Sequence, residues 1–425
     1  MKNFWINIIL LGMILGTAWA VRGQFGHEQG AAWAGAIGAF GLVLLSNRKD
    51  WLNKIYIIAL VSAVGWGVGG MISYGRVVGY GRSDSLPNAF YGLLMLFVIG
   101  GLFGMLGGGL TGLSLETSEK KRVNWGNLIS QMVAGGLIVY GFLVMQLGIK
   151  MTPPRSEAWA LCLGGSLAMI WYMARKGFHS SLRLAIYTTF GAGFGFAFGN
   201  VLQIVGNVLE IQFNMWNVME YSIGFFGGSS LAFGVFTLTW PDTLNEKQDK
   251  WKHIVSFLVV VAFIPLIVFR ESLQFDLLLK RLSHVTTNET VAMISSLGAL
   301  LSIIAVIAIT GYFGNFKSLA DNKNRAWFVF LLYFVLYVAV SLIVSGVFAG
   351  VVPLNHWLYL VNLMLILPLV RKSLMHVDYS GRFNVNVLKG WPYYLSVVIL
   401  LIFLFALILT NIHGEMSGAH NRFEL

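Results

Sequence analysis

The stretch GGLFGMLGGGLTG, residues 100–112, decides the class of this chain. Its glycines Gly100, Gly104, Gly108 and Gly112 recur at every fourth position of an apolar run, so a helix carries them on one face. In lipid, such a bare face lets two helix backbones approach closely, and dispersion then replaces the missing hydrophobic driving force. The stretch therefore predicts a closely packed transmembrane helix.

A second ladder, Gly191, Gly195 and Gly199, has the same spacing. Of the 49 glycines, 40 precede residue 241 and 9 follow, so we expect close packing only in the first half. The chain divides into a glycine-rich transmembrane hairpin bundle with a candidate polar site (1–240), a cytoplasmic linker loop (241–253), a second transmembrane bundle for scaffold or oligomer contact (254–411) and a polar C-terminal tail (412–425).

The composition excludes a soluble domain, because 57% of residues are hydrophobic, 11% are charged and the mean hydropathy is +0.73. We predict an all-α polytopic membrane protein with about 13 transmembrane helices. Lys and Arg exceed Asp and Glu by 11 and gather in alternate short loops, which predicts a cytoplasmic N-terminus and a C-terminus on the outer side. No interleaved basic and aromatic pattern points to nucleic acid.

Several chemistries are excluded by their missing motifs. The single cysteine, Cys162, excludes an internal disulfide, and no Cys/His cluster has the spacing of a zinc site. The glycine-rich run 104–112 lacks the lysine of a phosphate-binding loop, and no nucleophile elbow or zinc-protease motif occurs. We therefore predict no metal and no cofactor.

Four predicted outer loops, 22–30, 73–88, 148–157 and 199–217, each lead through polar and aromatic residues into a span of small residues. This pattern indicates four related helical hairpins of one orientation, as in transporters built from repeats. The alternative is convergence among glycine-rich hairpins. The first span also resembles a signal peptide ending in Ala18-Trp19-Ala20, but we interpret it as the first member of the repeat.

Polar groups at membrane depth are costly and usually face a protein interior or a wet cavity. Those of the first half predict a substrate-binding site formed by Arg22, Gln24, His27, Glu28, Gln29, Tyr74, Arg76, Asn200, Gln203, Asn207, Asn217 and Glu220.

Each group has a competing structural interpretation. Arg22 and Arg76 are either a fork for an anionic substrate or members of an internal ion pair, for example of Arg22 with Glu28 or Glu220. His27 and Glu28 are either a proton relay or, for the histidine, a donor to a backbone carbonyl.

Asn200, Gln203, Asn207 and Glu210 have the spacing of one polar stripe on a helix. Such a stripe either holds a ligand or joins two helices by hydrogen bonds. Other polar groups favour plainer interpretations. We expect Arg82 to lie in interfacial water, His356 to belong to an aromatic belt, and the C-terminal tail to be disordered.

The leading functional hypothesis is a secondary transporter or permease that moves a small polar, anionic solute across the cytoplasmic membrane. It leaves room for proton or cation coupling through His27 or Glu28, and for a homo-oligomer in the lipid bilayer. One alternative is an intramembrane enzyme acting at the outer face on a lipid-linked or acyl substrate, with His27 or Glu28 as general base. The other is a structural membrane subunit.

Overall fold

The computed structural model describes residues 2–153, 156–246, 249–313, 322–372 and 387–424. Within these ranges all regular elements are helices, and no strand forms. In chain order they are α1 (Lys2–Arg22), α2 (His27–Ser46), α3 (Lys49–Asn53), α4 (Ile55–Gly70), α5 (Gly75–Gly81), α6 (Leu86–Glu116), α7 (Trp125–Val139), η1 (Tyr140–Gln146), α8 (Glu157–Lys176), α9 (His179–Val208), α10 (Met215–Thr237), α11 (Lys250–Phe257), η2 (Leu258–Phe263), α12 (Ile264–Ser272), α13 (Phe275–Leu282), α14 (Glu289–Phe313), α16 (Lys323–Val344), η3 (Val347–Ala349), α17 (Leu354–Lys372) and α18 (Val387–Ile412).

The long apolar helices indicate an integral multi-pass membrane protein. Among the described residues, ten helices are long and apolar enough to cross a membrane, or up to 11 if a bent pair counts as one span. That pair is α4 and α5, which meet at an angle of 63°. Because α8 and α10 are not among these helices, the count of 13 stays a prediction.

Glycine ladders hold α6, α9, α10 and α1 together in that order. A Cβ atom at Gly112 would lie 2.9 Å from Cα of Ser181 on α9, and one at Gly195 would lie 2.6 Å from the Ser222 carbonyl oxygen on α10. On α10, a Cβ at Gly228 would lie 2.5 Å from the Leu11 carbonyl oxygen of α1. These close approaches confirm the predicted role of the glycine faces. In α14, by contrast, a Cβ at Gly298 would have no atom nearer than 3.5 Å among those around it.

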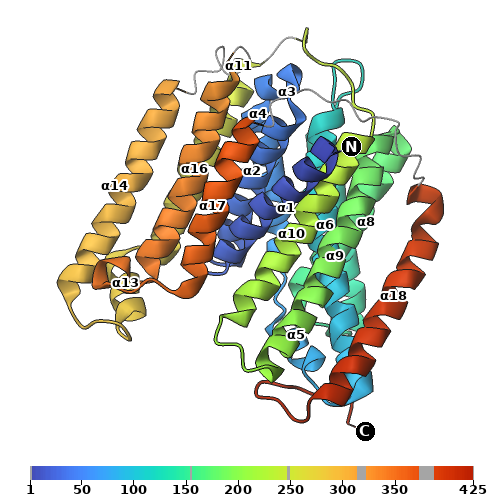
Figure 1. Cartoon of the computed structure of the whole chain (residues 1–425). Coiled ribbons are helices and arrows are strands. Elements are labelled where there is room, and N and C mark those ends of the chain that lie inside the picture. Colours follow the sequence, from blue (N-terminus) through green and yellow to red (C-terminus); the bar gives the residue numbers. More distant parts are fainter. Residues whose placement is uncertain (1, 154–155, 247–248, 314–321, 373–386, 425) are drawn as a thin grey trace.

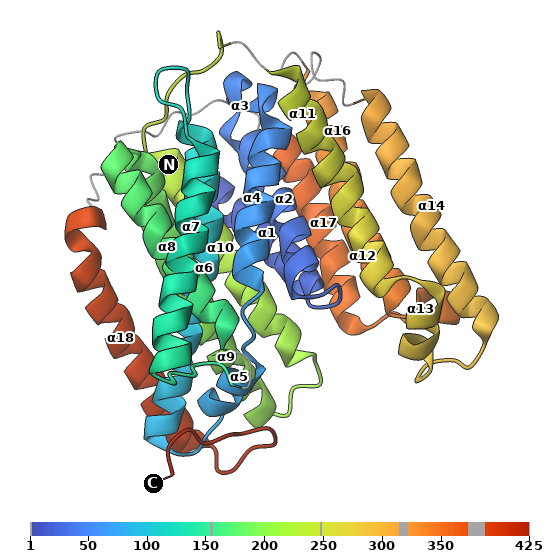
Figure 2. The ribbon, with the colours of Figure 1, turned by 180° about the vertical axis from the view of Figure 1, so that it is seen from behind.

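The second half of the chain lies in two places. Helices α14, α16 and α17 stand side by side next to α2, whereas α18 packs on α6 and α9 at the opposite side of the molecule (Figures 1 and 2). The apolar contact of α18 includes Ile402 and Ala406, which join Phe97 of α6 and Val201 of α9. The glycine-rich bundle is therefore flanked on two sides by helices from the second half.

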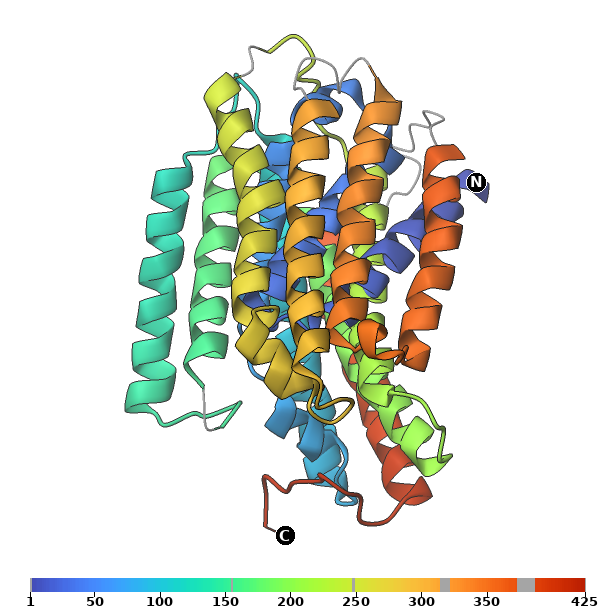
Figure 3. The ribbon, with the colours of Figure 1, turned by 90° about the vertical axis from the view of Figure 1, so that its left-hand side faces the viewer.

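The N-terminus and the C-terminus lie at opposite ends of the bundle (Figures 1 and 3). We call these ends the N-side and the C-side; which of them faces the cytoplasm stays a prediction. Two of the predicted outer loops, 73–88 and 199–217, contain more helix in the structure than expected. Helix α5 occupies much of 73–88, and α9 continues to Val208 within 199–217. These glycine-rich segments are helical because neighbouring helices pack against them.

Candidate functional site

Helix ends and a helix break meet inside the first half of the chain. Helix α1 ends at Arg22 and α2 begins at His27, after a turn in which Gly26 has a φ of +91° that favours glycine. Tyr74 lies in the break between α4 and α5, and Glu220 lies near the start of α10. Chain segments about 200 residues apart thus bring their polar groups to one place.

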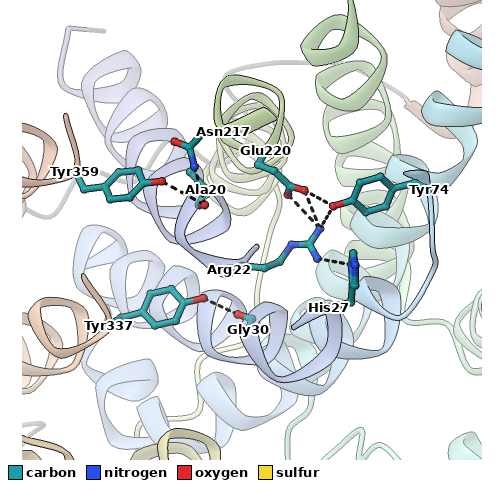
Figure 4. Close-up of polar contacts among 9 residues, drawn as sticks. All are labelled: Ala20, Arg22, His27, Gly30, Tyr74, Asn217, Glu220, Tyr337 and Tyr359. Carbon is teal, nitrogen blue, oxygen red and sulfur yellow. Dashed lines mark hydrogen bonds and ion pairs between the residues drawn. The ribbon is translucent and has the colours of Figure 1, made fainter. Parts of the chain in front are cut away.

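These side chains form a connected cluster around the Arg22 guanidinium (Figure 4). Nη2 of Arg22 donates to the Tyr74 hydroxyl at 3.0 Å and to Oε2 of Glu220 at 3.1 Å. Nη1 of Arg22 lies 3.0 Å from Nδ1 of His27. The Tyr74 hydroxyl donates to Oε1 of Glu220. We call Arg22, His27, Tyr74 and Glu220 the Arg22 cluster.

The Arg22 cluster contains one permanent positive charge and one carboxylate, both removed from solvent. The Arg22 side chain is 0% exposed and that of Glu220 is 8% exposed. The guanidinium also lies 4.8 Å from the Trp19 ring centre, a cation–π contact. The structure thus contains the internal ion pair with Glu220, whereas Glu28 is exposed and Gln29 is half-buried beside it.

The backbone at the cluster is held by groups from both halves of the chain. The carbonyl oxygen of Ala20, in the last turn of α1, accepts from Nδ2 of Asn217 at 3.0 Å and from the Tyr359 hydroxyl at 3.4 Å. The Tyr337 hydroxyl donates to the Gly30 carbonyl at 2.9 Å (Figure 4). Because the last carbonyls of a helix lack partners within the helix, such donors fix where α1 ends.

A second polar cluster, which sequence reasoning missed, joins the α1–α2 turn to α16 and α17. Gln24 accepts at Oε1 from the Ser341 hydroxyl at 2.8 Å, and Nε2 of His356 lies 2.9 Å from the same hydroxyl and 3.2 Å from that of Ser345. His356 is 0% exposed, so it belongs to the core and not to an aromatic belt at the interface. Ser341 lies on α16 and Ser345 is its C-cap; their four-residue spacing indicates a shared helix face but not the partner that this face meets.

A pocket of about 340 Å³, the Arg76 pocket, lies directly beside the Arg22 cluster. Its lining includes Tyr74, Arg76, Thr152 and His420. Arg76 is exposed, and no described contact joins it to Arg22. The two arginines therefore do not form a single fork; Tyr74, which contacts the Arg22 guanidinium and lines the pocket, connects their surroundings.

The predicted amide stripe is partly formed. Nδ2 of Asn200 donates to Oε1 of Gln203 at 3.0 Å, and Gln203 and Asn207 line a second pocket. Glu210 does not continue the stripe, because α9 ends at Val208 and Glu210 has a left-handed φ of +51°. The helix therefore presents three of the four predicted groups.

The described part of the C-terminal tail is docked, contrary to the expected disorder. Oδ1 of Asn88, on α6, accepts from the backbone N–H groups of Arg422 and Phe423 at 2.6 and 2.8 Å. The N–H of His420 donates to the Gly79 carbonyl on α5 at 3.0 Å. Arg82, expected in interfacial water, is half-buried and donates to the Ser417 carbonyl at 3.3 Å in an exposed hydrogen bond. A polar tail is fixed here because buried Asn88 supplies partners for its backbone.

Within the described residues, no three His, Cys, Asp or Glu side chains gather closely enough to hold a metal ion. Comparison with protein families, curated proteins and solved structures found no match to this chain. The fold and the site are those of a multi-pass helical membrane protein with a buried ion pair, Arg22 with Glu220, beside a pocket.

Proposed function

We propose that this protein is a secondary transporter or permease that moves a small polar, anionic solute through the first half of the chain. One observation carries the proposal: a buried ion pair, Arg22 with Glu220, lies where helices end or break, and its neighbour Tyr74 lines a pocket that Arg76 also lines. Ionisable groups inside membrane proteins commonly mark a solute path, and discontinuous helices commonly form its site.

Tyr74 gives the proposal its path. Its ring is buried, its hydroxyl contacts both Arg22 and Glu220, and the same residue lines the Arg76 pocket. Tyr74 thus belongs both to the pocket lining and to the Arg22 cluster, and a solute in the pocket would approach the Arg22 guanidinium past this residue. Rotation of Tyr74, in the break between α4 and α5, would open this path.

Charge balance favours proton coupling through Glu220. The Glu220 carboxylate accepts hydrogen bonds from the Arg22 guanidinium. A solute anion must therefore displace this carboxylate in order to bind Arg22. A second buried anion beside one cation is costly unless one of the two anions is neutralised. Protonation of Glu220 would release Arg22 to the solute, and Glu28, which is exposed, is less suited to this role.

The test is uptake by proteoliposomes that contain the full-length protein. Radiolabelled succinate, sulfate, phosphate, glutamate and glucose would be offered with and without a pH gradient. We expect uptake of at least one anion, stimulated by a gradient that supplies protons with the solute. The double variant Arg22→Gln with Glu220→Gln removes both charges together, and we expect it to fold and to lose uptake.

Arg122→Gln is the matched control, because this arginine lies in a loop between α6 and α7 and its side chain is 74% exposed. Normal uptake by the folded double variant would refute the proposed site. If wild-type protein takes up no compound while remaining folded, the transporter hypothesis fails and the enzyme or subunit hypotheses gain.

A further inference from the structure

A pocket of about 440 Å³ on the C-side, here the Arg82 pocket, is distinct from the Arg22 cluster. Its wall is formed by the end of α9, the loop before α10, the first turn of α10 and the docked tail. The lining residues are Arg82, Gln203, Asn207, Phe213, Asn214, Met215, Trp216, Met416 and Ser417. Pockets of this volume are suited to small solutes.

The first observation concerns the charge of Arg82. Its guanidinium lies 5.2 Å from the Trp216 ring centre and donates through Nη1 to the Ser417 carbonyl. In the part of the chain that the structure describes, no carboxylate forms an ion pair with Arg82, and its buried Nε atom has no hydrogen-bond partner. Glu220 neutralises the positive charge of Arg22. The positive charge of Arg82 has no such carboxylate partner among the described residues.

The second observation is independent and concerns Gln203. This side chain is 0% exposed, and its Oε1 atom accepts from Asn200. Its Nε2 atom is buried and has no hydrogen-bond partner, although the residue lines the pocket. A buried donor without an acceptor costs free energy, and an acceptor in the pocket would remove this cost.

A positively charged arginine lines each of the two pockets beside the docked tail. Burial and the positive charges of Arg76 and Arg82 lower the pKa of His420, which lies on the docked tail and lines the Arg76 pocket. A guanidinium and a neutral amide donor together suit an oxyanion, because its charged oxygens accept hydrogen bonds.

We propose that the Arg82 pocket binds a small oxyanion, a carboxylate, sulfate or phosphate group, between the Arg82 guanidinium and the amide of Gln203. This binding proposal does not depend on the proposed transport function. If the proposed function also holds, the pocket collects the solute at the C-side before it reaches the Arg22 cluster. Trp216 forms an apolar wall that suits the carbon part of a carboxylate ligand.

The test is isothermal titration calorimetry of the full-length protein in detergent at constant ionic strength. The probes are succinate, sulfate and phosphate, with neutral succinamide for comparison. We expect at least one anion to bind and succinamide not to bind. Arg82→Gln should weaken binding about tenfold or more, since one charge-assisted contact is lost. Arg122→Gln should leave it unchanged.

Two further variants keep the proposal testable if Arg82→Gln fails to fold. Asn207 is exposed at the rim of the pocket, so its substitution is tolerated more easily. Asn207→Lys should tighten anion binding, and Asn207→Asp should weaken it. Unchanged binding in all folded pocket variants would overturn the proposal, as would a wild-type protein that binds no probe.

The same variants separate this site from the proposed function. Loss of binding in Arg82→Gln with normal uptake would confirm the pocket and place it off the transport path. Loss of calorimetric binding only in the double variant Arg22→Gln with Glu220→Gln would refute the pocket and place the anion at the Arg22 cluster.

Discussion

Arg22 and Arg82 show how surroundings give one side chain two roles. Around Arg22 the chain places a carboxylate, a phenol and an indole, so the charge is neutralised and held. Arg82 has an indole and a backbone carbonyl but no described carboxylate partner. The first arrangement neutralises the charge within the protein, and the second leaves the charge without a described carboxylate partner.

A stability prediction belongs to this scale. Arg22→Ala leaves the buried Glu220 carboxylate without its ion-pair partner and should cost about 3–5 kcal/mol, whereas removing both charges together should cost much less. The measurement is the Tm of the purified single and double variants in detergent. If the single variant were as stable as the double variant, the ion pair would not be structural.

At the scale of the element, glycine has two different meanings in this chain. On α6, α9 and α10 it marks positions where a neighbouring backbone touches the helix. On α14 the space around Gly298 is ordinary, and glycine there only lowers helix propensity. The same residue type therefore stabilises one helix through packing and weakens another.

This contrast predicts opposite effects of the same substitution. Gly195→Ala should destabilise the protein, because its Cβ would lie 2.6 Å from the Ser222 carbonyl oxygen. Gly298→Ala should be neutral or stabilising by up to about 1 kcal/mol. Thermal unfolding of both variants in one detergent would decide, and equal shifts would show that close packing does not explain the ladder.

At the scale of the whole molecule, residues from the far end of the chain complete sites in the first half. The tail supplies Met416 and Ser417 to the Arg82 pocket and His420 to the Arg76 pocket. Asn88 on α6 holds the tail through its backbone. Residues more than 330 positions apart therefore depend on one another.

Docking of the tail should weaken in acid. Because the pKa of His420 is lowered in the folded state, its contribution to docking is present above its unfolded pKa of about 6.5 and is lost as the pH falls through the folded value. A fluorophore on Asn421→Cys, with Cys162→Ser to remove the other thiol, should report a mobile tail at low pH. His420→Gln should abolish this pH dependence; retained dependence would assign it to another group.

The sequence by itself determined the membrane class, the helical fold and the helix faces that meet, because spacing along a helix is fixed by its geometry. It also indicated Arg22 and Glu220, which are buried, but it predicted depth equally for Glu28, Arg76 and Asn207, which are exposed. It could not choose between a substrate fork and an ion pair. That choice depends on distance between segments about 200 residues apart.

Only the tertiary structure decided which polar groups meet. His356 and Ser341 reach the α1–α2 turn from the second half, and α18 leaves that half to pack on α6 and α9. The tail, polar in sequence, is ordered because α5 and α6 supply its hydrogen-bond partners. Such contacts arise from three-dimensional packing, and local spacing along the chain carries no record of them.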